Sequence, residues 1–429
     1  MKTYIKPNRN DWSELIRRPE MKAQDLNELV ASVFQTVEKL GDSGVRGYTK
    51  RFDQVEIFEP KVREEEIQLA RKLVPQKLKD AIKTAEQNIR KFHNSQVIEE
   101  SSVETQSGVK CWRETRAIEK VGLYIPGGTA PLFSTVLMLG IPAQIAGCDR
   151  IVLCTPPSKD GTINPAILFT AQLVGITEIY KIGGVQAIAA LAQGTESIPK
   201  VDKIFGPGNQ YVTAAKSFAL TKGVAIDMPA GPSEVLVIAD ETSNPAFVAA
   251  DLLSQAEHGA DSQVILLSTS EIMLNRVQTE IEVQLASLPR MEIAIDALNN
   301  SSFIQLKTLE ECLELSNKYA PEHLILAFET ASEYIEKITN AGSVFIGKYS
   351  CESAGDYASG TNHTLPTNGY ARNYSGVSLD SFIKKITFQE LSVSGIQSLG
   401  PAIEIMAEAE QLIAHKNAVS IRLKALKNA

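Results

Sequence analysis

The stretch Val121-Gly-Leu-Tyr-Ile-Pro126 begins a series of short apolar runs, rich in β-branched residues, that alternate with segments of helix length. Further runs of the same kind are RIVLCTPP at 150–157, EIYKIGG at 178–184, DKIFGPG at 202–208 and VAIDMP at 224–229. Such alternation is typical of βαβ units, in which helices cover both faces of a parallel sheet. Residues 121–229 are therefore predicted to form a parallel α/β domain.

A second series of the same kind begins at Glu234. It contains VLVIAD at 235–240, QVILLS at 263–268 and SVFIG at 343–347. The Pro/Gly-rich segment 228–233 is the predicted turn between the two series. The predicted fold class is α/β, with two incomplete Rossmann-like parallel-sheet domains and helical elements at both termini.

The flanking regions have helical patterns. Apolar residues recur at helical spacing in the charge-rich segment 21–100, and one amphipathic pattern runs over 402–426 in the tail. The predicted division is an N-terminal arm at 1–20, a first Rossmann-like domain of 21–120 with 230–378, a second at 121–229 and a helical tail at 379–429. The tail is too short to fold alone, so we expect it to pack on the body or on another subunit.

Composition excludes several functional classes. The net charge of -8 argues against binding to nucleic acid or to an anionic membrane, which leaves a small molecule or another protein as the expected partner. There is no signal-peptide pattern and no apolar run near membrane-spanning length, so a cytoplasmic location is expected. The five cysteines form no CxxC pair, which argues against a disulfide framework and a thiolate zinc site.

Four of the five histidines lie in short polar clusters in the last part of the chain. Asn244-Pro245 is a good helix start and Gly259 a plausible stop, and Gln255 and His258 would lie on one face of that helix. An amide oxygen and an imidazole nitrogen there could bind one divalent metal. A hydrogen-bonded histidine at the helix end, favoured by the helix dipole, is the alternative.

The other clusters have two interpretations each. Glu322-His323 could divide acid/base work, or Pro321 could simply start a helix with Glu322 in its first turn. Asp356, in the polar stretch after SVFIG, could be a hard metal ligand or a turn former, and this stretch is expected beyond the carboxyl ends of the strands. Glu410 and His415 in the tail would usually be a solvated pair.

Three glycine-containing turns follow predicted strands and suit close approach of a phosphate: Gly127-Gly128, Gly183-Gly184 and Gly206-Pro-Gly208. None carries the full dinucleotide fingerprint, so these turns neither establish nor exclude a nucleotide site. Cys154 could be an aldehyde-oxidising nucleophile, but a buried structural thiol is the better default.

Several long strings, in the expected order over nearly the whole chain, closely resemble the histidinol dehydrogenase family. They are VGLYIPGGTAPLFSTVLM, GGVQAIAALAQGTES, IFGPGNQYV, DMPAGPSEVLV, LLSQAEHG, APEHL, GDYASGTNHTLPT, NYSGVSLDSFIKK and AHKNA. The resemblance implies zinc-dependent oxidation of L-histidinol to L-histidine through histidinaldehyde with two NAD, the last step of histidine biosynthesis. It also implies a homodimer with an intertwined tail, and no nucleic acid or membrane partner.

The resemblance assigns roles residue by residue. It implies one zinc ion per subunit, with the ligands Gln255, His258, Asp356 and His415. The same four residues, with Ser233, His323 and Glu410, would contact the substrate. His323 would be the general base and Glu322 would activate water, while Tyr124, Gln186 and Asn209 would contact NAD. Glu410 and His415 are expected to enter the partner's site.

Two functions of a different class fit the residues taken alone. A zinc hydrolase would use Glu322 and a metal with water but no dinucleotide. A binding protein with two α/β lobes would use the same clefts without chemistry. Formation of NADH from L-histidinol separates the dehydrogenase from both.

Overall fold

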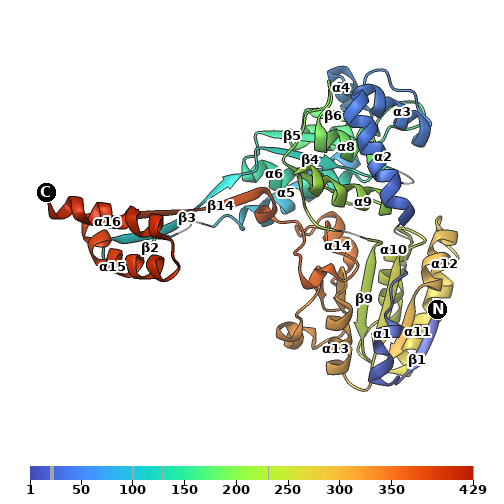
Figure 1. The fold of residues 1–429 in the computed structure, drawn as a ribbon. Helices are drawn as coiled ribbons and strands as arrows, with labels where there is room; N and C mark the ends of the chain where they lie inside the picture. The colour runs from blue at the N-terminus through green and yellow to red at the C-terminus, as the bar shows by residue number, and fades with distance from the viewer. Residues whose placement is uncertain (20–23, 99–100, 128–129, 230, 429) are drawn as a thin grey trace. The chain divides into compact units, whose positions relative to one another are not determined.

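The computed structural model describes residues 1–19, 24–98, 101–127, 130–229 and 231–428. The chain divides into two compact units (Figure 1). The first comprises Met1–Gln96 with Ile118–Phe382, and the second comprises Val97–Ala117 with Ile383–Ala429. Each unit is therefore built from segments that are distant in the sequence.

The first series of apolar runs forms a five-stranded sheet in the first unit, with the order β6-β5-β4-β7-β8. All four neighbouring pairs are parallel, which confirms the prediction for this region. The strands are β4 (Lys120–Tyr124), β5 (Arg150–Thr155), β6 (Glu178–Lys181), β7 (Lys203–Phe205) and β8 (Ala225–Ile226).

The second series forms a six-stranded sheet, with the order β1-β11-β10-β9-β12-β13 and only parallel pairs. Its strands are β1 (Lys2–Ile5), β9 (Glu234–Ala239), β10 (Gln263–Ser268), β11 (Ser302–Gln305), β12 (His323–Leu326) and β13 (Ser343–Ile346). The N-terminal arm thus supplies an edge strand, β1. Without it, both sheets have the third-second-first-fourth-fifth strand order of a doubly wound half, which confirms the predicted fold class.

Helices cover both sheets. Along β9, Val235 and Val237 pack toward helices α10 to α12, whereas Leu236 and Ile238 pack in the cluster that includes α13. This two-sided burial explains why the strand is apolar at every position from Val235 to Ala239. These helices are α10 (Pro245–Ala256), α11 (Glu271–Leu285), α12 (Met291–Asn299) and α13 (Leu309–Tyr319).

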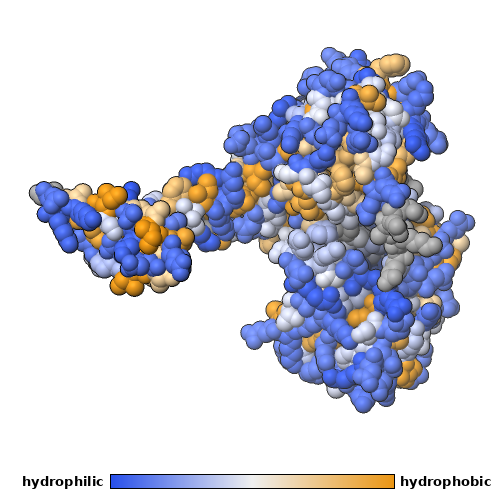
Figure 2. Space-filling view, in the orientation of Figure 1, coloured by the Kyte–Doolittle hydropathy of each residue, from blue (hydrophilic) through white to orange (hydrophobic). Residues whose placement is uncertain are grey.

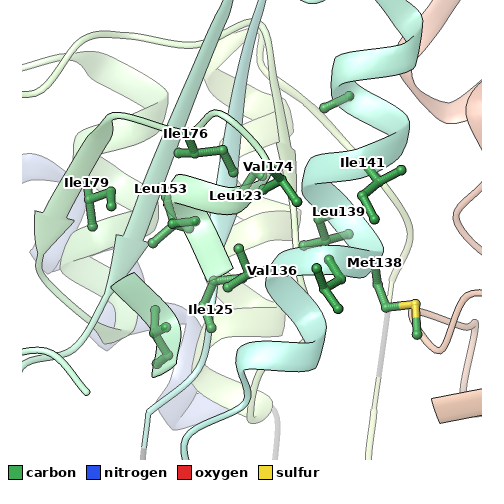
Figure 3. Close-up of a cluster of buried hydrophobic side chains, with 14 of the residues drawn as sticks. Leu123, Ile125, Val136, Met138, Leu139, Ile141, Leu153, Val174, Ile176 and Ile179 are labelled. Carbon is green, nitrogen blue, oxygen red and sulfur yellow. The ribbon is translucent and has the colours of Figure 1, made fainter. Parts of the chain in front are cut away.

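The five-stranded sheet has a core of its own. Leu123 of β4 and Leu153 of β5 lie in one buried cluster with Val136, Leu139 and Ile141 of α6 (Figure 3). The helices that follow the strands are α6 (Phe133–Ala146), α7 (Pro165–Leu173), α8 (Gly184–Gln193) and α9 (Gln210–Ala219).

The N-terminal helices also pack on this sheet's helices. Helix α2 contacts α8 and α9, α3 contacts α8, α4 contacts α7, and α5 contacts α6. Their bounds are α2 (Gln24–Leu40), α3 (Asp42–Phe52), α4 (Glu64–Leu73) and α5 (Gln76–Asn94). The predicted grouping of 21–120 with 230–378 is therefore wrong for these helices, because their apolar residues are buried in the clusters around β4 to β7.

The second unit contains a three-stranded antiparallel sheet and a pair of helices. The sheet has the order β14-β3-β2, with β2 (Val103–Gln106), β3 (Val109–Ala117) and β14 (Ile383–Leu391). The prediction of a wholly helical tail at 379–429 is wrong for β14, which pairs along its whole length with β3. The single amphipathic pattern forms two contacting helices, α15 (Val393–Ala409) and α16 (Ile413–Lys427), because Gln411 turns the chain with φ 60°.

Large apolar side chains lie on the surface of this unit (Figure 2). Ile405, Met406 and Ile421 are each about two-thirds exposed, at 68%, 64% and 67%. Apolar residues at such exposure on a small helical pair are typical of a surface that another chain covers. Among the described residues, no helix combines the length and apolar character needed to cross a bilayer.

Candidate active site

A cavity of about 1010 Å³ in the first unit brings together turns from both parallel sheets. The five-stranded sheet contributes the turn after β7, and the six-stranded sheet contributes residues at the starts of β9 and β12. The predicted site residues that line it are Asn209, Ser233, Gln255, His258, Glu322, His323 and Asp356. Segments predicted to be functional from separate motifs therefore meet in one place.

The position of this cavity on the six-stranded sheet corrects one prediction. The polar stretch with Asp356 was expected beyond the carboxyl ends of the strands. Instead, Asp356 Oδ1 lies 3.5 Å from Nε2 of His323, the first residue of β12, so the cluster is at the amino ends. Within this stretch, the short helix α14 (Glu352–Tyr357) carries Asp356 at this edge of the sheet.

Helix α10 carries Gln255 in its last turn. The predicted start is confirmed, since the Asn244 side chain accepts a hydrogen bond from the Ala246 amide and Pro245 is the first helical residue. The helix ends at Ala256, so the prediction that His258 lies within it is wrong. A 3.2 Å hydrogen bond from the His258 amide to the Gln255 carbonyl still keeps the two residues in one turn.

Glu322 and His323 are buried at the start of β12, which rules out the alternative that Pro321 starts a helix there. Both side chains contact the backbone of Glu234 on the neighbouring strand. Its amide donates to Glu322 Oε2 at 2.8 Å, and its carbonyl lies 3.2 Å from His323 Nδ1. Because a carbonyl can only accept, Nδ1 carries the hydrogen and Nε2 is left to take up a proton.

The electrostatics of this pair are strongly perturbed. Burial raises the pKa of Glu322 to about 8, although the neighbouring His323 opposes this shift. Burial lowers the pKa of His323, but the carboxylates of Glu352, Glu322 and Asp356 outweigh it and raise that pKa above its ordinary value. Two strongly shifted pKa values on adjacent residues in a cavity are typical of acid/base residues.

A group of metal-ligand type lies beside His323. Ligand atoms of His258, Glu352 and Asp356 all lie within 4.8 Å of one another. Among the described residues, Gln255 Oε1, Glu352 Oε2, Asp356 Oδ1 and His323 Nε2 are buried without a hydrogen-bond partner. Several unpartnered ligand atoms converging in one buried place fit a bound cation, because each would otherwise be costly to bury.

Glu352 was not among the residues predicted from sequence. It lies four residues before Asp356, which places both carboxylates on one face of α14. That spacing would have indicated it only if a helix had been predicted for this segment.

His363 lies at the edge of the same cluster. Its Nδ1 is 2.9 Å from the Asp356 carbonyl and its Nε2 is 3.0 Å from the Thr135 hydroxyl of α6. His363 thus connects α14 to a helix of the five-stranded sheet, as a neighbour of the site.

A second cavity, of about 800 Å³, lies at the carboxyl ends of the five-stranded sheet and contains two of the three predicted cofactor contacts. Tyr124 and Asn209 line it, and Asn209 also lines the first cavity. The Tyr124 hydroxyl accepts a hydrogen bond from the Gly184 amide, and the Asn209 side chain caps α9. Gly128, in one of the predicted turns, lies outside the described residues.

Gln186, the third predicted contact, lies behind this cavity. It is fully buried, and its Nε2 donates to Asp53 Oδ2 at 3.1 Å. Asp53 does line the cavity, and burial raises the pKa of this carboxyl to about 6. Gln186 therefore lies next to this cavity without lining it, and Asp53, which was not predicted from sequence, is the carboxylate between them.

Glu410 and His415 belong to the second unit, where both are exposed. Glu410 follows the last residue of α15 and His415 lies in the first turn of α16. All five cysteines are free, and Cys154 is completely buried, as expected of a structural thiol.

Comparisons with known proteins agree on one family. The family model for histidinol dehydrogenase matches residues 16–423. Histidinol dehydrogenase of Bacteroides thetaiotaomicron is 59% identical over 427 residues, with 100% of both chains covered. That of Escherichia coli is 53% identical over 417 residues, covering 96% of this chain and 95% of its own. The crystal structure of histidinol dehydrogenase from Elizabethkingia anophelis has a TM-score of 0.98 at 63% identity, covering 100% of this chain and 99% of the other.

Proposed function

The chain belongs to the histidinol dehydrogenase family, and we propose that it oxidises L-histidinol to L-histidine through histidinaldehyde, with two NAD, as the last step of histidine biosynthesis. One structural observation carries the proposal. The buried Glu322–His323 pair shares a single cavity with Gln255 and Asp356, whose ligand oxygens have no hydrogen-bond partner. Acid/base groups and a metal site are thus available to one substrate.

The donor set fits zinc. An imidazole, carboxylate oxygens and an amide oxygen suit zinc and several other divalent ions. We propose Gln255, His258 and Asp356 as ligands from the first unit, with His415 as the fourth. When bound, zinc would hold and polarise the substrate's imidazole and amine, and NAD would accept the hydride. Ser233, which lines the cavity, would add a substrate contact.

His323 is positioned to remove the alcohol proton. Its Nε2 has no hydrogen-bond partner among the described residues, while its Nδ1 is held by the Glu234 carbonyl. In the first oxidation Nε2 takes the hydroxyl proton as hydride leaves the carbinol carbon, and the aldehyde results. In the second oxidation it takes a proton from the aldehyde hydrate in the same way.

Glu322 serves the hydration step between these oxidations. Its carboxylate removes a proton from the water that adds to the aldehyde carbon, and a raised pKa makes it a stronger base than an ordinary carboxylate. Because the hydrate is needed only for the second oxidation, Glu322 and His323 have separable roles.

The second cavity is proposed to hold part of the dinucleotide. Asn209 lines both cavities, so a cofactor there could extend from one toward the other. Tyr124 and Asn209 would contact NAD directly, and Gln186 would act from behind the cavity wall through Asp53.

We further propose a homodimer in which Glu410 and His415 of the tail enter the site of the partner subunit. The exposed apolar residues of the second unit support this, because an isolated small unit gains stability when such a surface is covered. As a biosynthetic enzyme of this kind, the protein is proposed to act in the cytoplasm.

The direct test is an absorbance assay for NADH with purified, zinc-loaded protein, L-histidinol and NAD. NADH formation supports the proposal. No NADH, in a buffer where a known histidinol dehydrogenase is active, would contradict it and favour a hydrolase or a binding protein.

A further inference from the structure

We propose that Arg18 of the N-terminal arm is a positioning residue for the Glu322–His323 pair and acts on it through Glu234. This inference rests on the proposed function, because it takes that pair as the catalytic one. Arg18 has no motif around it, and it lies 216 residues from Glu234 in the sequence.

Glu234 is the common point of contact for the pair. Its amide donates to the Glu322 carboxylate and its carbonyl holds His323 Nδ1. A shift of this one backbone unit would turn both catalytic side chains at once. The position of Glu234 therefore sets which atoms of Glu322 and His323 face the cavity.

The Glu234 side chain is in turn held by Arg18. The guanidinium donates to both carboxylate oxygens, from Nε at 2.5 Å and from Nη2 at 2.8 Å. Nη2 also donates to the Tyr319 carbonyl at 2.9 Å, and the guanidinium lies 3.9 Å from the centre of the Tyr319 ring. A bidentate ion pair with a stacked arginine fixes orientation as well as charge.

Arg18 also neutralises a negative charge next to the site. The Glu234 side chain is only 3% exposed, and the site already contains carboxylates of Glu322, Glu352 and Asp356. Removing Arg18 would leave the Glu234 carboxylate buried without its cation and would repel Glu322. Arg18 thus keeps the Glu234 backbone in place and lowers the negative charge that Glu322 meets.

The test compares three variants of the full-length, zinc-loaded enzyme: Arg18→Met, Arg18→Lys and the double variant Arg18→Met with Glu234→Gln. In Arg18→Met we expect kcat for oxidation of histidinaldehyde to histidine to fall by about tenfold or more, a fraction of the effect of losing a general base. The KM for the aldehyde should change little. Reduction of histidinaldehyde by NADH, which uses His323 but not Glu322, should also slow down, but by a smaller factor.

The other two variants separate positioning from a general structural defect. Arg18→Lys keeps the charge but loses the bidentate geometry, so it should recover only part of the activity. The double variant removes the uncompensated carboxylate, so it should have a higher melting temperature and a higher kcat than Arg18→Met. It also provides a folded comparison if the single variant unfolds.

The matched control is Arg9→Met. Arg9 lies in the same arm, and its side chain is 58% exposed in an ion pair with Glu314. The proposal is overturned if Arg18→Met matches this control, or if both directions of the reaction fall equally in the double variant. Nitrogen chemical shifts of His323 give a readout without turnover, since Arg18→Met should alter its Nδ1–H tautomer. Absence of NADH with the unmodified enzyme would instead refute the proposed function.

Discussion

Glu322 and His323 show how one backbone unit can give adjacent side chains different tasks. The Glu234 amide can pair only with an acceptor and its carbonyl only with a donor, so the two neighbours are held by different atoms. His323 is left with a free Nε2 and Glu322 with a carboxylate of raised pKa. The division of labour follows from these contacts.

Replacing Glu322 by Gln tests that division. We expect the overall conversion of histidinol to histidine to slow by about a hundredfold, the lower range for loss of a general base. Reduction of histidinaldehyde by NADH should be much less affected, because it needs no water. Stopped-flow measurement of both reactions checks this, and equal losses in the two would refute the assignment.

The raised pKa of Asp53 should make the stability of the protein depend on pH. The folded-state pKa of this carboxyl, raised by burial to about 6, lies above the ordinary value of 3.8. The folded state therefore binds this proton more tightly than the unfolded chain does. As pH rises from about 4 to about 6 the proton is lost, and the buried charge progressively lowers the free energy of unfolding. Above about pH 6 this loss of stability is complete. Asp53→Asn should thus stabilise the cofactor-free protein at pH 8 and have little effect at pH 4.

Urea unfolding of the two proteins at both pH values checks this expectation. Glu56→Gln is the control, since this carboxylate is exposed in an ion pair with Lys50. If Asp53→Asn raises the free energy of unfolding equally at pH 4 and pH 8, the pKa of Asp53 is not raised by burial.

Among the helices and strands, features that depend on neighbouring residues could be predicted from the sequence. Features that depend on contacts with distant residues could not. The start of α10 follows from Asn244-Pro245, because a cap uses only neighbouring residues. β14 was missed because its conformation depends on pairing with β3, far away in the sequence. Among the site residues, Gln255 and His323 lie in recognisable strings. Glu352 and Arg18 lie outside those strings, and the structure identifies them by their contacts.

Helix caps give a matched pair of variants at this scale. Asn209 and Asn244 both cap helices through their side chains, but only Asn209 lines the cavities. Asn209→Ala and Asn244→Ala should each lower the free energy of unfolding by about 1 kcal/mol. Only Asn209→Ala should weaken NAD binding in fluorescence titration; similar weakening in both would mean that the cap, and not a cofactor contact, explains the effect.

At the scale of the whole molecule, the proposed dimer predicts complementation between subunits. His258 belongs to the first unit and His415 to the second. In the proposed dimer, each site would take His258 from one subunit and His415 from the other. His415→Asn and His258→Asn homodimers should each be nearly inactive. Mixed dimers, made by dissociation and reassembly, should each contain one site with both histidines and recover up to about half of the activity of a wild-type dimer.

Activity of the mixed dimers, measured as NADH formation, is compared with that of each inactive parent carried through the same procedure. Mixed dimers without activity would place both histidines of a site in one chain.

The proposed reaction is a four-electron oxidation that depends on a bound divalent metal. It is tested most directly by the stoichiometry of the reaction, with NADH measured by absorbance and L-histidine by chromatography. We expect two NADH and one L-histidine for each L-histidinol consumed, with activity lost on chelation and restored by zinc. One NADH per histidinol with histidinaldehyde as the product, or full activity after complete removal of metal, would contradict it.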